Sequence, residues 1–457
     1  MPDLSSETLP PDRPEELGRV VTKSARWVAL SAAVGMATVL LTTIALAHLL
    51  ERKEFGLAVL AMLVVAVLGL FQDSGLHAAL IQRQHRVQEA VDTASLYAPL
   101  TGLVLCGLCV AAAPLAGRFF HTHEVTQLVR ALGAVFVLRS FSVVPSAILQ
   151  KELLFARQAM VSMPGSLLQM GAAITLAALG AGAWAIIGGQ IVLAGWSAST
   201  LWLLSPMRPN PRRASLEELR GLLRYGRHIV AGNVIGFVNS STDATLIGRM
   251  FGPASLGTYT LGFQTGTYAV TTVTRVTNLL VFPAYAKLQD DTQRFRRAYL
   301  RSLRFICVIS MPAALGLAAI SGEFVRVVYG DKWAGAVPVL TLIALQGLFL
   351  SVAATIGNVF KAAGKPQFFF HVGLLHLVLL FAFVAALYRF GISGFAGARA
   401  ATTFAVEWLS LVLAGRILGI RVREWLQTIR PSFTAALVMA GGLLNELGKI
   451  KRFAHLC

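Results

Sequence analysis

The stretch GRHIVAGNVIGFVNSSTDATLIGRMFGPASLGTYTLGFQTGTYAVTTVTRVTNLLVFPAYAKLQ, residues 226–289, decides the fold class of this chain. It holds two long apolar runs separated by a short Gly-Pro turn, with one aspartate, Asp243, and one arginine, Arg275, at membrane depth. A charge in hydrocarbon is costly, so a chain that keeps one usually turns it toward a partner or a watery cavity. The stretch therefore predicts a pathway through a membrane rather than a simple anchor.

The composition of the whole chain is typical of an integral membrane protein. Of the 457 residues, 56% are hydrophobic and only 14% are charged, a balance that a soluble domain cannot match without a very large exposed apolar surface. The net charge of +18 comes from Lys and Arg in short loops, which indicates topology signals and argues against a nucleic-acid partner. The four cysteines have neither the number nor the spacing of a disulfide framework or a zinc site, so we expect no metal and no cofactor.

Apolar runs divide the chain into spans, because a membrane-crossing helix needs about twenty mainly apolar residues. The sequence predicts an all-α, polytopic membrane protein with about 12 transmembrane helices in two six-helix bundles related by pseudo-two-fold symmetry. The runs lie near residues 27–50, 55–80, 92–116, 125–149, 157–180, 183–205, 228–250, 256–286, 305–322, 334–358, 367–388 and 391–415. The domains that follow are a cytoplasmic polar tail (1–24), an N-terminal bundle (25–205), a cytoplasmic amphipathic linker (206–227), a C-terminal bundle (228–418) and a cytoplasmic or partly membrane-associated tail (419–457).

Basic residues in alternate loops set the orientation. With the N-terminus in the cytoplasm, the inside segments carry 26 Lys and Arg and the outside segments carry seven. Such an excess is a strong positive-inside signal. The first 23 residues lack the pattern of a signal peptide, so we expect a multi-pass protein of the bacterial cytoplasmic (inner) membrane with a cytoplasmic N-terminus.

The linker between the bundles contains its own helix signal. Ser215 is a candidate N-cap, two glutamates follow it, and the leucines at 216, 219, 222 and 223 fit an amphipathic helix on the inner surface. A shift of 201 residues lays Gly35 on Gly236 and Leu60 on Leu261. Together with the equal helix counts, these weak matches favour two parallel repeats related by an axis along the membrane normal.

Several stretches together resemble the Wzx-type polysaccharide or oligosaccharide flippase family of the multidrug/oligosaccharidyl-lipid/polysaccharide exporter superfamily. They are FGLAVLAMLVVAVLGLFQDSGLHAALIQR (55–83), DATLIGRMFGPASLGTYTLGF (243–263), FPAYAKLQDDTQRFRRAYLR (282–301), MPAALGLAAISGEFVRVVYGDKWAGAVPVL (311–340) and KAAGKPQ (361–367). The resemblance covers about residues 20–425. It implies translocation of an undecaprenyl-pyrophosphate-linked repeat unit from the inner to the outer leaflet by two bundles that open alternately around a cationic cavity.

The end of the chain departs from that family pattern. Family members often carry two further helices, whereas the apolar run from Phe433 to Leu444 is too short to span and gives way to NELGKIKRFAHLC. We expect the core transport unit to survive this difference. The flippase interpretation gives the protein a lipid-linked oligosaccharide and anionic membrane lipids as partners, with a polysaccharide polymerase and a chain-length regulator as further ones.

Three arginines at membrane depth are the predicted substrate-binding residues. Arg139 lies near the middle of the fourth predicted span, Arg275 near the middle of the eighth, and Arg399 in the first half of the twelfth. A planar guanidinium stays charged and can fork onto phosphate oxygens, so three of them converging on a cavity suit a pyrophosphate group. The alternative is that each arginine pairs with a local carbonyl or carboxylate, or reaches back toward the bilayer surface.

Four further residues are candidates for coupling or gating. Asp243 is a candidate proton- or sodium-coupling carboxylate, with an interhelical ion pair or a bond to the neighbouring Ser and Thr residues as the alternative. Asp73 and His77 stand four residues apart on one helical face and are candidates for an inner gate or for a structural contact. Glu407, eight residues beyond Arg399, is placed to balance cationic charge.

Other classes of membrane protein fit less well. The chain has no P-loop GxxxxGK[ST], so it does not hydrolyse ATP by itself. A multidrug or cation antiporter of the related branch needs acidic residues in its cavity, where this chain offers arginines. A glycosyltransferase, polymerase or ligase needs a sizeable outside loop, and the longest outside segment, 322–333, has only about a dozen residues. We therefore expect no enzyme, and a non-transporting scaffold of a glycan-assembly complex stays open.

Overall fold

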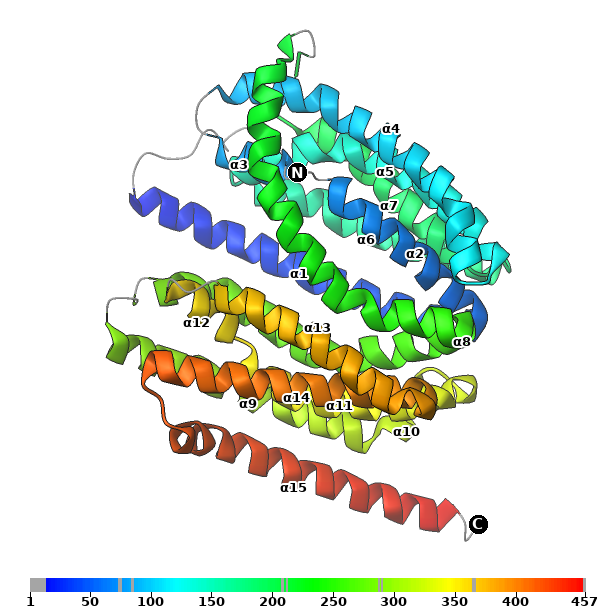
Figure 1. The fold of residues 1–457 in the computed structure, drawn as a ribbon, viewed down its shortest axis with the longest axis vertical. Helices are drawn as coiled ribbons and strands as arrows, with labels where there is room; N and C mark the ends of the chain where they lie inside the picture. Colours follow the sequence, from blue (N-terminus) through cyan, green and yellow to red (C-terminus); the bar gives the residue numbers. More distant parts are fainter. Residues whose placement is uncertain are drawn as a thin grey trace. The chain divides into compact units, whose positions relative to one another are not determined.

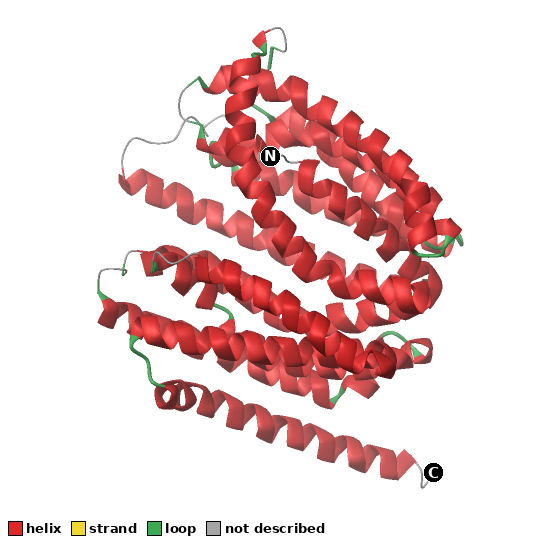
Figure 2. Ribbon diagram, viewed as in Figure 1, coloured by secondary structure: helices red, strands yellow, loops and turns green. Residues whose placement is uncertain are grey.

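A computed structural model describes residues 14–72, 76–83, 86–206, 209–210, 213–286, 288, 291–363 and 367–454. Every regular element among these residues is a helix, and no strand occurs in the described part (Figures 1 and 2). The chain forms two compact units, Met1–Phe237 with Gly252–Ala254, and Val238–Phe251 with Ser255–Cys457.

The first unit is a bundle of apolar helices and includes the beginning of α8. Its helices are α1 (Pro14–Leu49), α2 (Arg52–Gln72), α3 (Leu76–Gln82), α4 (Val87–Phe119), α5 (His123–Lys151), α6 (Phe155–Ala178) and α7 (Trp184–Leu204). Helix α5 is the central element, since it packs against α2, α3, α4, α6 and α7. Its middle carries Val135 and Phe136, both buried, so this helix forms much of the core of the unit.

The second unit contains the rest of α8 (Leu216–Ala286 as a whole) and the elements that follow it. These are α9 (Thr292–Ala319), α10 (Ser321–Val328), η3 (Asp331–Ala336), α11 (Val337–Ala353), α12 (Ile356–Ala362), α13 (Gln367–Leu387), η4 (Tyr388–Phe390), α14 (Gly391–Leu418) and α15 (Val422–Ala454). Helix α11 packs against both α9 and α14, and α13 packs against α14. Gly419 ends α14 in the left-handed conformation at φ 63°, which a glycine adopts without a Cβ penalty.

Helix α8 joins three segments that the sequence treats separately. It begins at Leu216, inside the predicted linker, and continues through the seventh and eighth predicted spans to Ala286. Its one non-helical residue is Gly252, at φ 79° and ψ 178°. The Gly-Pro turn expected between the two spans is therefore a sharp break within a continuous run, and the linker helix is the first part of the same element.

Helix α15 occupies the region assigned to the C-terminal tail. It packs along α9 (Figure 1), with Trp425, Ser432, Ala436 and Ala440 buried at spacings of one or two turns. Around this stripe the helix exposes Leu437 and other large apolar side chains. A helix with a narrow packed stripe and an exposed apolar surface is suited to contact with lipid.

Nine stretches of the described residues are long and apolar enough to cross a membrane. They are Arg26–Leu49, Arg52–Gln82, Val87–Phe119, His123–Lys151, Phe155–Ala178, Trp184–Leu204, Thr292–Ala319, Asp331–Phe360 and His371–Leu418. The last stretch holds most of α13 and all of α14, and α8 is not among the nine. Each of the twelve predicted spans thus overlaps one or more helices, and the seventh and eighth lie on the two parts of α8 on either side of Gly252.

Candidate functional site

The second unit contains a buried ion pair between Asp243 on α8 and Arg399 on α14. Arg399 Nη1 lies 2.7 Å from Asp243 Oδ2, and the two side chains are only 13% and 4% exposed. Tyr259, on the part of α8 beyond Gly252, donates its hydroxyl to the same carboxylate oxygen at 3.0 Å. The ring of Phe263 lies 5.0 Å from the guanidinium, at cation–π distance. The charge of Arg399 is therefore balanced within the protein.

The ion pair joins α8 to α14, and Asn239, one turn before Asp243, joins α8 to α13. Arg399 Nη1 also approaches the carbonyl oxygen of Asn239 at 3.5 Å, and the Asn239 amide donates to the carbonyl of Gly373 on α13 at 3.3 Å. Two buried atoms of the pair, Asp243 Oδ1 and Arg399 Nε, have no hydrogen-bond partner among the described residues. A charged group left partly unsatisfied in an apolar setting is costly, which is typical of a site that changes its contacts during function.

Arg139 lies in the first unit, on the central helix α5. Its side chain is exposed on that unit, and Nη2 donates to the amide oxygen of Gln190 on α7 at 3.2 Å. Arg275 lies on α8, with its side chain outside the described residues. Arg139 and Arg399 belong to different units, so the convergence of the three arginines on one cavity stays a prediction.

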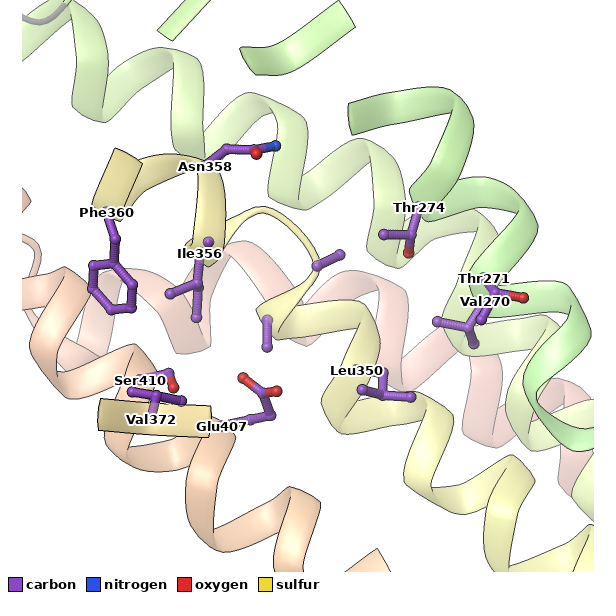
Figure 3. A pocket seen from close by; sticks show the side chains of 13 residues that line it. Val270, Thr271, Thr274, Leu350, Ile356, Asn358, Phe360, Val372, Glu407 and Ser410 are labelled. Carbon is purple, nitrogen blue, oxygen red and sulfur yellow. The ribbon is translucent and has the colours of Figure 1, made fainter. Parts of the chain in front are cut away.

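Glu407 on α14 lines a cavity of about 510 Å³ within the second unit (Figure 3). Figure 3 shows its carboxylate turned into the space between α8, α12 and α14. The polar residues that share the lining are Thr271, Thr274, Asn358 and Ser410. Among the described residues Glu407 makes no hydrogen bond and no ion pair, so its charge is not balanced as that of Asp243 is.

Glu407 is a candidate from the sequence, whereas the polar side chains around it were not predicted. Thr271 and Thr274 stand three residues apart, as do Glu407 and Ser410, so each pair shares a helical face. This i, i+3 spacing of oxygen-bearing side chains within apolar spans is the signal that could have found them. A carboxylate oxygen can bind a proton, and carboxylate and hydroxyl oxygens together can coordinate a small hard cation.

Of the two inner-gate candidates, the structure describes only His77. Asp73 lies outside the described residues, and His77 is half-buried on the short helix α3. The end of α3 is fixed by Lys151 at the end of α5, whose ammonium donates to the carbonyls of Leu80 and Arg83. The contact between Asp73 and His77 therefore stays a prediction.

The linker packs on the first unit near the ends of α3 and α5. It does so through residues that were not predicted from the sequence. Arg83 donates to the carboxylate of Glu218 on α8 at 2.7 Å. The backbone N–H of Asn210 donates to Asp92 at 2.8 Å, and that of Ser215 donates to the hydroxyl of Thr93 at 3.1 Å. Both acceptors are side chains in the first two turns of α4. Hydrogen bonds from the linker backbone to these side chains therefore hold the linker on the bundle. No signal in the sequence distinguishes this arrangement from a helix resting on lipid.

The arrangement of helices is similar to that of solved membrane proteins. The structure is similar to "Lipid II flippase MurJ, inward closed conformation", with a TM-score of 0.69 and 12% identity, over 95% of this chain and 100% of that one. It is also similar to an inward-facing multidrug resistance MATE family transporter of the MOP superfamily, with a TM-score of 0.65 and 16% identity, over 84% of this chain and 95% of that one. The fold is therefore the two-bundle fold of the MOP superfamily.

The family follows from sequence comparison. Residues 45–338 match the family described as "Polysaccharide biosynthesis protein". The chain is 26% identical to the lipopolysaccharide biosynthesis protein WzxC of Escherichia coli K12, over 76% of this chain and 70% of the relative. It is 28% identical to the succinoglycan biosynthesis transport protein ExoT of Rhizobium meliloti, over 79% of this chain and 73% of the relative. The chain belongs to this family, which confirms the resemblance to polysaccharide flippases found in the sequence.

Proposed function

We propose that this protein moves an undecaprenyl-pyrophosphate-linked oligosaccharide repeat unit from the inner to the outer leaflet of a bacterial cytoplasmic membrane, by alternating access of its two bundles. The observation that carries the proposal is the family match over residues 45–338, in a chain with the two-bundle MOP fold. Two relatives are named for the biosynthesis of lipopolysaccharide and for the biosynthesis and transport of succinoglycan.

The charges at membrane depth support an anionic cargo. A sugar pyrophosphate cannot cross hydrocarbon unaided, and arginine is the side chain best suited to fork onto its phosphate oxygens. Arg139 is exposed at mid-span on its own unit, whereas Arg399 is buried and already faces a carboxylate. We therefore assign phosphate binding to Arg139 and Arg275, and a structural or gating role to Arg399 with Asp243.

The energy for net transport is assigned to a cation gradient. Glu407 is a carboxylate within a span, in a cavity with hydroxyl side chains, and it has no described cationic partner. Such a group gains stability from a proton or a small cation that binds as the cavity opens to one side. Asp73 and His77 remain inner-gate candidates, and the polymerase and chain-length regulator remain expected partners on the outer side.

The experiment uses a strain that lacks this gene. We expect loss of the surface polysaccharide and accumulation of lipid-linked repeat units on the inner leaflet, measured by labelling with a membrane-impermeant reagent before and after lysis. Wild type restores transport, Arg139→Ala does not, and Arg130→Ala on the same helix α5 serves as a matched control. Full rescue by Arg139→Ala refutes the assignment of this arginine, and unchanged leaflet distribution in the deletion strain refutes the flippase function.

A second function is favoured by one observation, the acidic cavity around Glu407 in a fold shared with a MATE transporter. A cation antiporter of that branch would accept an organic cation at this carboxylate. The deletion strain distinguishes the two functions: greater sensitivity to lipophilic cations with normal surface polysaccharide indicates the antiporter. A scaffold is distinguished by rescue with a variant that assembles normally and does not transport.

A further inference from the structure

A second cavity, of about 550 Å³, lies between α9 and α15 of the second unit. Its lining from α9 is Leu300, Arg301 and Arg304, and its lining from α15 is Glu424, Gln427, Thr428 and Pro431. The two arginines stand three residues apart, so both guanidinium groups come from one face of α9. The cavity is therefore bounded by two cationic side chains on α9 and, on α15, by the acid Glu424 and the polar side chains of Gln427 and Thr428.

The two cavity arginines differ from the other arginines of α9. Arg294 pairs with Asp291 at 3.1 Å, Arg296 pairs with Glu424, and Arg297 donates to the backbone carbonyl of Gln293 at 3.4 Å. Arg301 and Arg304 make no hydrogen bond and no ion pair with any described residue. Guanidinium donors that the protein leaves open on one side of a cavity fit an anionic ligand.

The acid in this cavity does not cancel the positive charge. Glu424 forms its ion pair with Arg296, which lies outside the lining. Gln427 supplies an amide that can donate to a further oxygen. The result is an excess of two positive charges facing the cavity, with planar donors whose geometry matches the oxygens of a phosphate group.

Large apolar side chains that are exposed on both helices lie close to the cavity. On α9, the large exposed apolar residues Phe305, Val308 and Ile309 follow Arg304 directly. On α15, Leu437 and Val438 are exposed two turns beyond Pro431. At 1.5 Å per residue these positions lie within about 10 Å of the cavity along each helix. Phosphates concentrate at this depth of a bilayer, on the side that the distribution of basic residues assigns to the cytoplasm.

We propose that this cavity binds the phosphate of an anionic membrane lipid, whose acyl chains lie against the exposed apolar surfaces of α9 and α15. A zwitterionic head group fits less well, because its ammonium meets two guanidinium groups while the nearby carboxylate is already paired. The bound lipid adds a second link between α9 and α15 beside the ion pair of Arg296 with Glu424. This site is separate from the membrane-depth arginines assigned to the transported molecule.

The proposal is tested by native mass spectrometry of the purified full chain, titrated with phosphatidylglycerol or phosphatidylcholine. We expect wild type to retain one phosphatidylglycerol more firmly than phosphatidylcholine, and Arg301→Ala/Arg304→Ala to bind it roughly 30-fold more weakly. The matched control is Arg294→Ala/Arg297→Ala, which removes the same charge from the same helix and should change binding less than about threefold. An equal loss in both double variants refutes a local site, as does equal retention of the two lipids by wild type.

Two further measurements keep the result interpretable. Arg301→Lys/Arg304→Lys preserves charge, so it should fold like wild type and bind with intermediate strength because the planar fork is lost. Inorganic pyrophosphate is the probe for a soluble ligand: if it displaces phosphatidylglycerol at equal concentration, the site serves a free phosphate and the lipid assignment is wrong. Neither measurement uses a glycan substrate, so its outcome does not depend on whether the protein is a flippase.

Discussion

Arg399 on α14 and Asp243 on α8 are 156 residues apart in sequence and form a 2.7 Å ion pair in the interior of the second unit. This contact places one predicted substrate-binding residue and one predicted coupling residue in a single structural group. Their charges cancel, so neither can act without changing the state of the other. Variants of these two residues can therefore distinguish a structural role from a role in transport.

Removal of either member alone should destabilise the second unit. We expect Arg399→Ala and Asp243→Ala each to cost about 3 to 5 kcal/mol in free energy of unfolding, because each leaves a buried charge without its partner. The double variant should cost clearly less than the sum of the two single variants. The measurement is the unfolding midpoint of purified protein in detergent.

The exposed pair Lys449–Glu446 on α15 provides the control for this cycle. Its side chains are 56% and 64% exposed, so Lys449→Ala should change stability by less than about 1 kcal/mol. Strictly additive effects at Arg399 and Asp243 would contradict a direct interaction between them.

Substitution of Glu407 should separate coupling from folding. Glu407→Gln keeps the shape of the side chain and removes the charge, so we expect wild-type yield and an almost complete loss of gradient-driven transport. Exchange of labelled substrate down its own gradient should persist, because the path is intact. The measurement is transport in proteoliposomes with imposed proton or sodium gradients, and Glu407→Asp should retain part of the coupled activity. Coupled transport at the wild-type rate in Glu407→Gln would place the coupling site elsewhere.

The sequence predicted the class of fold because apolar runs and basic loops are local signals. The fourth predicted span, 125–149, corresponds to His123–Lys151 in the structure. Asp243 and Arg399 were predicted as separate candidates, one for coupling and one for substrate binding, and the structure joins them in one ion pair. Which faces of two helices meet depends on packing between distant segments, and periodicity of a strongly apolar helix does not identify its facing side. The ion pair could not be derived for this reason.

The C-terminal region shows a second kind of limit. The run from Phe433 to Leu444 is too short to span by itself, whereas α15 extends from Val422 to Ala454 because it packs on α9. The stripe Trp425, Ser432, Ala436 and Ala440 mixes polar and small residues, so it carries little hydrophobic signal. Contacts with α9 therefore organise this helix more than its own composition does.

Two neighbouring leucines test how the linker is held. Leu222 is 3% exposed and packs with Leu76, Leu80 and Val91 of the first unit, whereas Leu223 is 42% exposed. We expect Leu222→Ala to cost about 2 to 5 kcal/mol in free energy of unfolding, since it leaves a cavity in a packed cluster. Leu223→Ala should have an effect below about 1 kcal/mol on the protein in detergent. Equal effects of the two substitutions would favour a helix that rests on lipid instead of docking on the bundle.

Two glycines of α4 test the close approach of α4 and α5. A Cβ on Gly102 would lie 2.8 Å from the backbone oxygen of Phe136 and 2.6 Å from the side chain of Ser140, closer than real Cβ contacts allow. A Cβ on Gly107 would meet no described heavy atom within 4 Å. Gly102→Ala should therefore push α5 away and cost about 1 to 3 kcal/mol, because a backbone oxygen cannot rotate aside as a side chain can.

Gly107→Ala should instead be neutral or stabilise the helix by about 0.5 to 1 kcal/mol, since alanine loses less backbone entropy than glycine on folding. Unfolding midpoints of the two variants, measured side by side in the same detergent, give the comparison. Because α5 carries Arg139, Gly102→Ala should also reduce transport more than its loss of stability explains, while Gly107→Ala should transport like wild type. A stable and fully active Gly102→Ala protein would mean that α4 and α5 do not need their close contact during the transport cycle.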